Sequence, residues 1–278
     1  MVGSILSGTL LVRSPLSDST ASLVLTSTEI MGGCFCVAGF NKKEVTFNVD
    51  LAGIMSSLMI VSSACLVIPS SSFFADLWSN AQKPGGNYIL VLSHITAVIL
   101  LAFYIIYLVF QLKTHADIFA EYAEPEPEPE PESEGSTYLD PWAAGIVLIF
   151  ATIGVSFCSD YLVDSVDGFV EQLGVSRAFI GLIIVPIVGN AGELFTTFNQ
   201  ARKGNIDFAI GLIVGSTLQI ALFVTPFLVT LGWIIGRDMS LRFDTFQTTV
   251  LSMAVIVVNC LIRDGRSNYF EGILLIGT

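Results

Sequence analysis

The sequence predicts an all-α, polytopic membrane protein, and three observations lead to that fold class. Of the 278 residues, 53% are hydrophobic and only 13% are charged, whereas about a quarter of the residues in a soluble domain are charged. The mean hydropathy is +0.75. The apolar residues also form long runs, each near or above the ~17–25 residues that a spanning helix needs. These runs are 50–69, 88–112, 142–158, 178–198, 208–236 and 245–262.

An acidic tract divides the chain into two parts. Seven of its glutamates lie between 121 and 134, alternating with proline over much of that length, and they account for much of the net charge of −12. Proline at every second position excludes a helix and favours extended backbone. We therefore predict a first transmembrane repeat within 1–119, a Pro/Glu linker at 120–141 and a second transmembrane repeat at 142–278. The linker is either a solvated spacer or a cation-attracting, regulatory segment.

The two parts resemble each other weakly. Gly3-Ser4-Ile5-Leu6-Ser7 matches Gly215-Ser216-Thr217-Leu218-Gln219, and Phe47 with Asp50 matches Phe243 with Asp244, each pair preceding an apolar run. The second part holds five segments and the first holds counterparts of only the last three. An odd number of crossings inverts the second repeat relative to the first, so we predict inverted five-helix repeats with an incomplete first repeat and a binding site at mid-membrane.

Residues 13–29 interrupt this symmetry. They are polar and rich in Ser and Thr, and they separate the apolar runs 2–12 and 30–40. Irregular backbone is not tolerated against lipid, so we expect an extruded loop or an insert that does not belong to the protein, such as an intron read as coding sequence. The apolar start at Met1 and the short last run from 269 further predict a chain that is incomplete at both ends.

The run 178–198 contains one acid, Glu193, beside residues that weaken a helix. Pro186 lacks an N–H group, and Gly189 and Gly192 have low helix propensity, so we expect the span to unwind near its middle. Unwinding would present backbone carbonyls beside Asn190 and Glu193, and Ca²⁺ takes six to eight such oxygens. Removal from water favours a protonated carboxyl group and a bound cation favours the ionised one. This predicts a site where cation and proton compete; the alternative is a structural, protonated glutamate.

The positions of other polar residues indicate further candidates for an ion pathway. Ser216 and Gln219 are three residues apart and share a helix face, so they could offer oxygen atoms to a site at Glu193, or they could join neighbouring helices. Asp160 directly follows apolar sequence and could line an entrance that concentrates cations. We interpret all five cysteines as packing residues, because they lie within apolar runs without metal-ligand spacing.

These residues resemble a known family. Val188-Gly189-Asn190-Ala191-Gly192-Glu193, Gly215-Ser216-x-x-Gln219 and residues 221–236 are similar to the second repeat of the cation/proton exchangers, the Ca²⁺/H⁺ antiporters of fungal and plant vacuoles. Residues 3–7 and 92–115 resemble the first repeat. The resemblance covers nearly the whole chain outside 13–29 and most of 120–140, and an acidic stretch between the halves is also a feature of the family.

The resemblance implies a set of cation-binding residues. Glu193 would be one of two central glutamates that bind Ca²⁺ and protons in turn, and Asn190 with the carbonyl groups of Val188 and Gly189 would help to coordinate the ion. The neighbouring polar residues would be Ser216, Gln219, Ser4 and Ser7. Asp160 would lie near the cytosolic entrance. No cofactor, enzymatic activity or nucleic-acid partner is expected, and the partners are Ca²⁺ or a similar divalent cation, protons and membrane lipid, with a homo-oligomer left open.

The family pattern is not fully kept. The family has Ala, Ser or Thr at Gly192, His at Leu194 and Asn at Gly8, so cation selectivity and proton coupling stay open. The first-repeat glutamate motif is absent, so we expect no transport by this polypeptide as it stands. The resemblance implies an antiporter of the vacuolar membrane; a degenerate, non-transporting paralogue and a Na⁺-coupled exchanger are the alternatives. Positive charges favour a cytoplasmic side that holds Lys42, Arg202 and the linker.

Overall fold

The computed structural model describes residues 16–40, 42–70, 88–120, 141–174, 185–236, 239–241, 243 and 245–277. Within them the regular secondary structure is helical apart from a two-residue ladder, in which β1 (Val45–Thr46) pairs antiparallel with β2 (Arg266–Ser267). The α-helices are α2 (Leu16–Gly39), α3 (Val49–Val67), α5 (Tyr88–Val109), α6 (Ala116–Ala120), α7 (Pro141–Leu173), α9 (Val185–Gly189), α10 (Ala191–Lys203), α11 (Ile206–Gln219), α12 (Thr225–Ile235), α13 (Thr245–Ile262) and α14 (Tyr269–Ile276). The all-helical prediction is confirmed.

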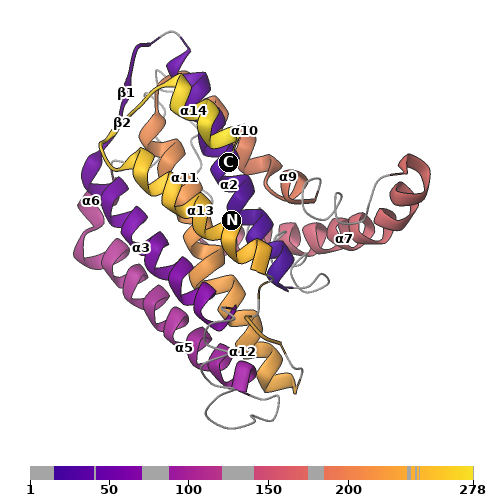
Figure 1. Ribbon diagram of the computed structural model, residues 1–278. Coiled ribbons are helices and arrows are strands. Elements are labelled where there is room, and N and C mark those ends of the chain that lie inside the picture. The colour runs from indigo at the N-terminus through magenta and orange to yellow at the C-terminus, as the bar shows by residue number, and fades with distance from the viewer. Residues whose placement is uncertain are drawn as a thin grey trace.

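Most helices form one bundle of steeply inclined neighbours, from which α7 extends to one side (Figure 1). Helix α2 runs along α10, α11, α13 and α14, and α3 packs against α11 and α13. The buried core comes mainly from these helices, with fully buried side chains that include Phe35, Leu51, Ile210 and Leu251. The bundle therefore brings α2, from the start of the chain, against α10 and α11, which come after the acidic tract.

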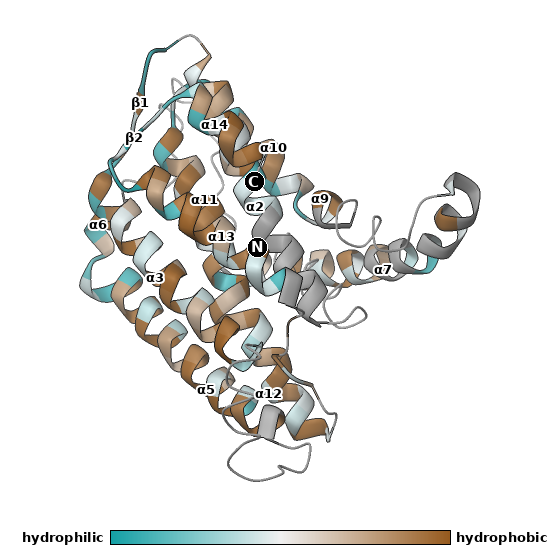
Figure 2. Ribbon diagram, in the orientation of Figure 1, coloured by the Kyte–Doolittle hydropathy of each residue, from teal (hydrophilic) through white to brown (hydrophobic). Residues whose placement is uncertain are grey.

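Hydropathy matches a membrane environment for the bundle. Three helical stretches of the described chain are long and apolar enough to cross a bilayer, Val49–Ser70, Leu90–Thr114 and Ile206–Ile235. Apolar residues cover the middles of the helices, whereas the β1–β2 ladder is more polar (Figure 2). Large apolar side chains such as Ile105 and Ile106 are well exposed on the outer face of α5, which is costly in water and favourable in lipid.

Local chemistry explains where several helices begin and end. Asn48 caps α3 by accepting hydrogen bonds from the N–H groups of Asp50 and Leu51, and its own N–H donates to Asp207 Oδ1 at 2.7 Å. That bond ties the start of α3 to the first turn of α11. Gly204 caps the C-terminal end of α10, and its φ of 92° is in the left-handed region that favours glycine.

A π-helical turn joins α11 to α12. It spans Ile220–Val224, and Pro226 follows as the second residue of α12. Proline has no N–H to donate and its ring crowds the carbonyl group four residues earlier. In a π-helical turn each N–H group bonds to the carbonyl group five residues earlier instead of four. This change of pattern lets the long span Ile206–Ile235 continue past Pro226.

The expected loop at 13–29 is corrected for the residues that the structure describes. Residues 16–29 form the first part of α2 instead of an extruded loop, and Thr26, Ser27 and Thr28 are buried. Ser and Thr are tolerated in buried helices because their hydroxyl groups can bond to backbone carbonyls one turn earlier. The domain boundaries and the incomplete first repeat stay predictions.

Candidate ion-binding site

The helix that carries Glu193 is broken at one residue, as the sequence predicted. Helix α9 ends at Gly189, Asn190 has φ −97° and ψ 7°, and α10 begins at Ala191. The carbonyl group of Asn190 accepts the N–H of Leu194 at 2.8 Å, so regular bonding resumes immediately. Since the carbonyl groups in the last turn of a helix have no partner within it, those of Val188 and Gly189 lie at an end where helical pairing stops.

Asn190 is buried at this break. Its side chain is 2% exposed, and among the described residues its Nδ2 atom has no hydrogen-bond partner. Leaving a buried polar group unpaired costs about 1–3 kcal/mol of stability. A native protein keeps such a group where it has a functional role that outweighs this cost. Gly189 beside it is also buried, whereas Val188 is exposed.

Glu193 meets Ser216 across two helices. Ser216 Oγ lies 2.5 Å from Glu193 Oε1 and 2.9 Å from the carbonyl oxygen of Ile213 in its own helix. A serine hydroxyl has one proton to donate and two lone pairs that accept. With Glu193 ionised, Ser216 donates to the carboxylate; with Glu193 protonated, Ser216 can accept from it and donate to Ile213. The same geometry therefore accommodates both states of the carboxyl group.

Two neighbours of Glu193 were missed by the sequence reasoning, Cys34 on α2 and Thr197 on α10. The Cys34 thiol is fully buried and lies within hydrogen-bonding reach of the Thr197 hydroxyl and close to Glu193. Thr197 is also fully buried, and its Oγ1 donates to the carbonyl oxygen of Glu193 at 2.8 Å. Thr197 could have been found from its position four residues after Glu193. Cys34 gave no such signal, because its approach depends on how α2 packs against α10.

The remaining predicted residues are placed only in part. Gln219 is half-buried, one turn beyond Ser216 on the same face of α11. Asp160 belongs to α7, but its side chain lies outside what the structure describes, as do Ser4 and Ser7 entirely. Among the described residues, no group of three His, Cys, Asp or Glu side chains gathers as a metal site. Of the predicted ligands, the structure thus brings the hydroxyl group of Ser216 to the carboxyl group of Glu193.

Comparison with known proteins places this arrangement in a class. The family described as "Sodium/calcium exchanger protein" matches residues 143–278. The vacuolar calcium ion transporter of Schizosaccharomyces pombe is 38% identical over 96% of this chain and 62% of its own length. A Ca²⁺/H⁺ antiporter of Synechocystis is 34% identical over 93% of this chain and 71% of its own length. The structure of native YfkE superposes with a TM-score of 0.74 at 31% identity, over 99% of this chain and 77% of that one.

The all-helical bundle, with a broken helix that carries a half-buried acid, matches exchanger structures and is that of an integral, multi-pass membrane protein. The chain belongs to the family of the Ca²⁺/H⁺, or cation/proton, exchangers. It spans less than two thirds of the length of the S. pombe transporter.

Proposed function

We propose that the protein exchanges Ca²⁺, or a similar divalent cation, for protons by alternating access, with Glu193 binding the two in turn. The observation that carries the proposal is the contact between Glu193 and Ser216, 2.5 Å between oxygen atoms, beside the break at Asn190. Broken helices inside a membrane are tolerated where they line a cavity or an ion path. An ionisable residue there is expensive and is most often functional.

The chemistry follows from competition for one group of oxygens. In the proton-loaded state Glu193 is a neutral acid that donates to Ser216, whose hydroxyl then donates to Ile213. In the cation-loaded state the carboxylate is a ligand, together with the side-chain oxygen of Asn190 and the carbonyl groups of Val188 and Gly189. Ca²⁺ takes 6–8 oxygens at about 2.3–2.6 Å, so further donors are needed. We assign these to Ser216, Gln219, Ser4 and Ser7, with Asp160 at the outer approach.

The setting of this exchange is proposed from the relatives. The S. pombe and rice proteins are named as vacuolar, which supports a vacuolar membrane here. The relatives are transporters and antiporters by name, which supports transport instead of catalysis. Ca²⁺ and protons are then substrates, and no resident cofactor enters the proposed mechanism.

The test is ion flux in sealed vesicles that carry the full-length gene product. An imposed pH gradient is expected to drive Ca²⁺ uptake, and Glu193→Gln is expected to reduce it to background because an amide cannot alternate between proton and cation. Glu44→Gln is the matched control, since Glu44 is an exposed acid that pairs with Arg266 at 3.8 Å. It is expected to leave uptake unchanged.

Two results would contradict the proposal. Uptake that survives Glu193→Gln would remove the assigned role of this carboxyl group. Uptake driven by a Na⁺ gradient but not by a pH gradient would replace the proton with Na⁺ as the coupling ion. Size-exclusion profiles of the variants identify any loss that comes from misfolding.

A further inference from the structure

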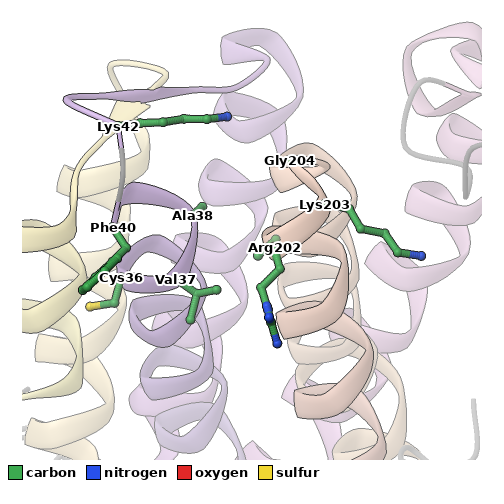
Figure 3. Close-up of a pocket in the computed structure, with 9 residues that line it drawn as sticks. Cys36, Val37, Ala38, Phe40, Lys42, Arg202, Lys203 and Gly204 are labelled. Carbon is green, nitrogen blue, oxygen red and sulfur yellow. The ribbon is translucent and has the colours of Figure 1, made fainter.

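An open pocket lies where two helices end on the same side of the bundle. Its volume is about 650 Å³, and it is formed by the last turn of α2 with the residues that follow it and by the last turn of α10. Three cationic side chains line it, Lys42, Arg202 and Lys203, together with an apolar wall that includes Val37 and Phe40. Arg202 and Lys42 extend into the space between the helices, while Lys203 extends away on the other side of α10 (Figure 3).

The positive charge of this pocket is not neutralised by the described part of the chain. None of its three cations forms an ion pair with a described acid. The acids nearest in sequence are engaged elsewhere, since Asp207 accepts the Asn48 N–H and Glu44 pairs with Arg266. The carbonyl end of α10 favours cations in its last turn, and Lys42 Nζ lies near Gly204 at that end. The helix end accounts for cations close to it, but not for the presence of Lys42 and Arg202 beside an apolar wall in one open pocket.

The pocket lies at the depth of a membrane surface. The apolar span Ile206–Ile235 begins two residues after Gly204, and the span Val49–Ser70 begins seven residues after Lys42. Phe40, at the end of α2, is 85% exposed, and aromatic side chains of this kind are common at the level of the lipid headgroups. Cationic and apolar side chains around one open pocket meet the two requirements of a bound lipid, the first for its headgroup and the second for the start of its acyl chains.

We propose that this pocket binds the phosphate headgroup of an anionic lipid from the leaflet on this side of the membrane. The positive residues of the loops favour this side as cytoplasmic, and the cytoplasmic leaflet is the one rich in anionic lipid. Basic pockets between transmembrane helices are suited to such headgroups because arginine binds phosphate through two parallel hydrogen bonds and lysine adds a point charge. The site is separate from Glu193 and does not depend on the proposed exchange.

The experiment compares two double variants that remove equal charge. Wild-type chain, Lys42→Gln/Arg202→Gln and the control Lys113→Gln/Arg263→Gln are each reconstituted in phosphatidylcholine nanodiscs with a small fraction of phosphatidylinositol phosphate. Native mass spectrometry then counts the anionic lipid that each protein retains. Lys113 and Arg263 are exposed cations outside the pocket. At about 1 kcal/mol for each cation near the surface, the pocket variant is expected to bind the lipid roughly thirtyfold more weakly than wild type, with the control close to wild type.

Three outcomes would overturn the proposal. Equal retention by wild type and the pocket variant would show that the pocket does not hold the lipid, and equal losses in both variants would show that only general surface charge matters. If the otherwise unchanged chain retains lipid only after the glutamates of the acidic tract are changed to glutamine, the tract occupies the pocket in place of the lipid. Displacement of the lipid by excess free inositol phosphate, without loss in inorganic phosphate, is the result expected for headgroup recognition.

Discussion

Ser216 is the residue on which the two states of the candidate site depend. Its hydroxyl group lies within hydrogen-bonding distance of one carboxyl oxygen and one backbone carbonyl, and it has a single proton. The hydroxyl group donates that proton to Glu193 when the carboxyl group is ionised, and to the carbonyl group of Ile213 when Glu193 is protonated. A hydroxyl that can serve either state lowers the cost of switching between them, because the half-buried carboxyl group keeps a hydrogen-bond partner in both.

Replacing Ser216 tests this at the scale of one residue. Ser216→Ala is expected to raise the KM for Ca²⁺ uptake about tenfold or more, since a hydrogen bond to a charged group contributes about 1.5–3 kcal/mol. Ser216→Thr keeps the hydroxyl and is expected to retain most of the activity. Ser252→Ala is the control, because Ser252 donates to the carbonyl group of Thr248 within α13. A KM unchanged by Ser216→Ala would argue against any role for this hydroxyl in the cation-loaded state.

At the scale of elements, α2 is held to its neighbours by glycine contacts. A Cβ atom on Gly32 would lie 2.6 Å from the carbonyl oxygen of Gly272, and one on Gly272 would lie 2.6 Å from that of Gly32. The two backbones of α2 and α14 therefore approach each other directly. Gly33 faces α10 in the same way, because its Cβ would meet the ring of Phe198. Small residues permit this close packing in membranes, where van der Waals contact replaces the hydrophobic effect.

Gly272→Ala is therefore expected to separate α14 from α2 and to destabilise the protein by about 1–3 kcal/mol, as overpacking does. Gly53→Ala is the matched control in α3, where an added Cβ meets open space. It is expected to be neutral or to stabilise the helix by up to about 1 kcal/mol. Thermal unfolding in detergent measures both. If the two alanine variants melt together, the close approach of α2 and α14 does not contribute to stability.

For the whole molecule, helix pairing agrees with the symmetry proposed from the sequence. The predicted inverted repeat equates α2 with α11 and α12, α3 with α13, and α5 with α14. A two-fold axis that exchanges the two repeats would place the contact between α2 and α14 in the same position as one between α5 and the α11–α12 span. The same axis would map the contact between α3 and α13 onto itself. All three pairs are in contact. The pairing supports the inverted repeat, which stays a prediction.

Orientation is a prediction for the whole molecule. A protease site placed at Glu128, within the acidic tract, is expected to be cut from the cytoplasmic face of sealed vacuolar vesicles, because positive loop residues are retained on that side. A site placed after Lys83 is expected to be cut only after the vesicles are permeabilised, because Lys83 lies between the predicted spans 50–69 and 88–112 and so on the opposite side. Immunoblotting of a terminal tag follows both cleavages. The reverse pattern would invert the assigned orientation.

Much of the fold and part of the candidate site could be predicted from local sequence. Spans expected at 208–236 and 245–262 match helices within one or two residues, because hydropathy and length decide where a chain can cross lipid. The break near Glu193 followed from Pro186 and Gly189. The extruded loop expected at 13–29 was wrong for residues 16–29, because polarity was taken as exclusion from a helix although buried hydroxyl groups can bond within it. The alternative, that these residues are an insert, stays a prediction.

The sequence by itself therefore determined that this is a helical membrane protein, where one helix is interrupted, and which acid lies at the interruption. These properties depend on the propensity and polarity of neighbouring residues. Only the tertiary structure decided that Ser216 reaches Glu193, that Cys34 joins them from α2, and that Lys42 and Arg202 converge on one pocket. Such contacts join residues far apart in the chain, and they exist only because close packing of the helices selects one set of facing side chains.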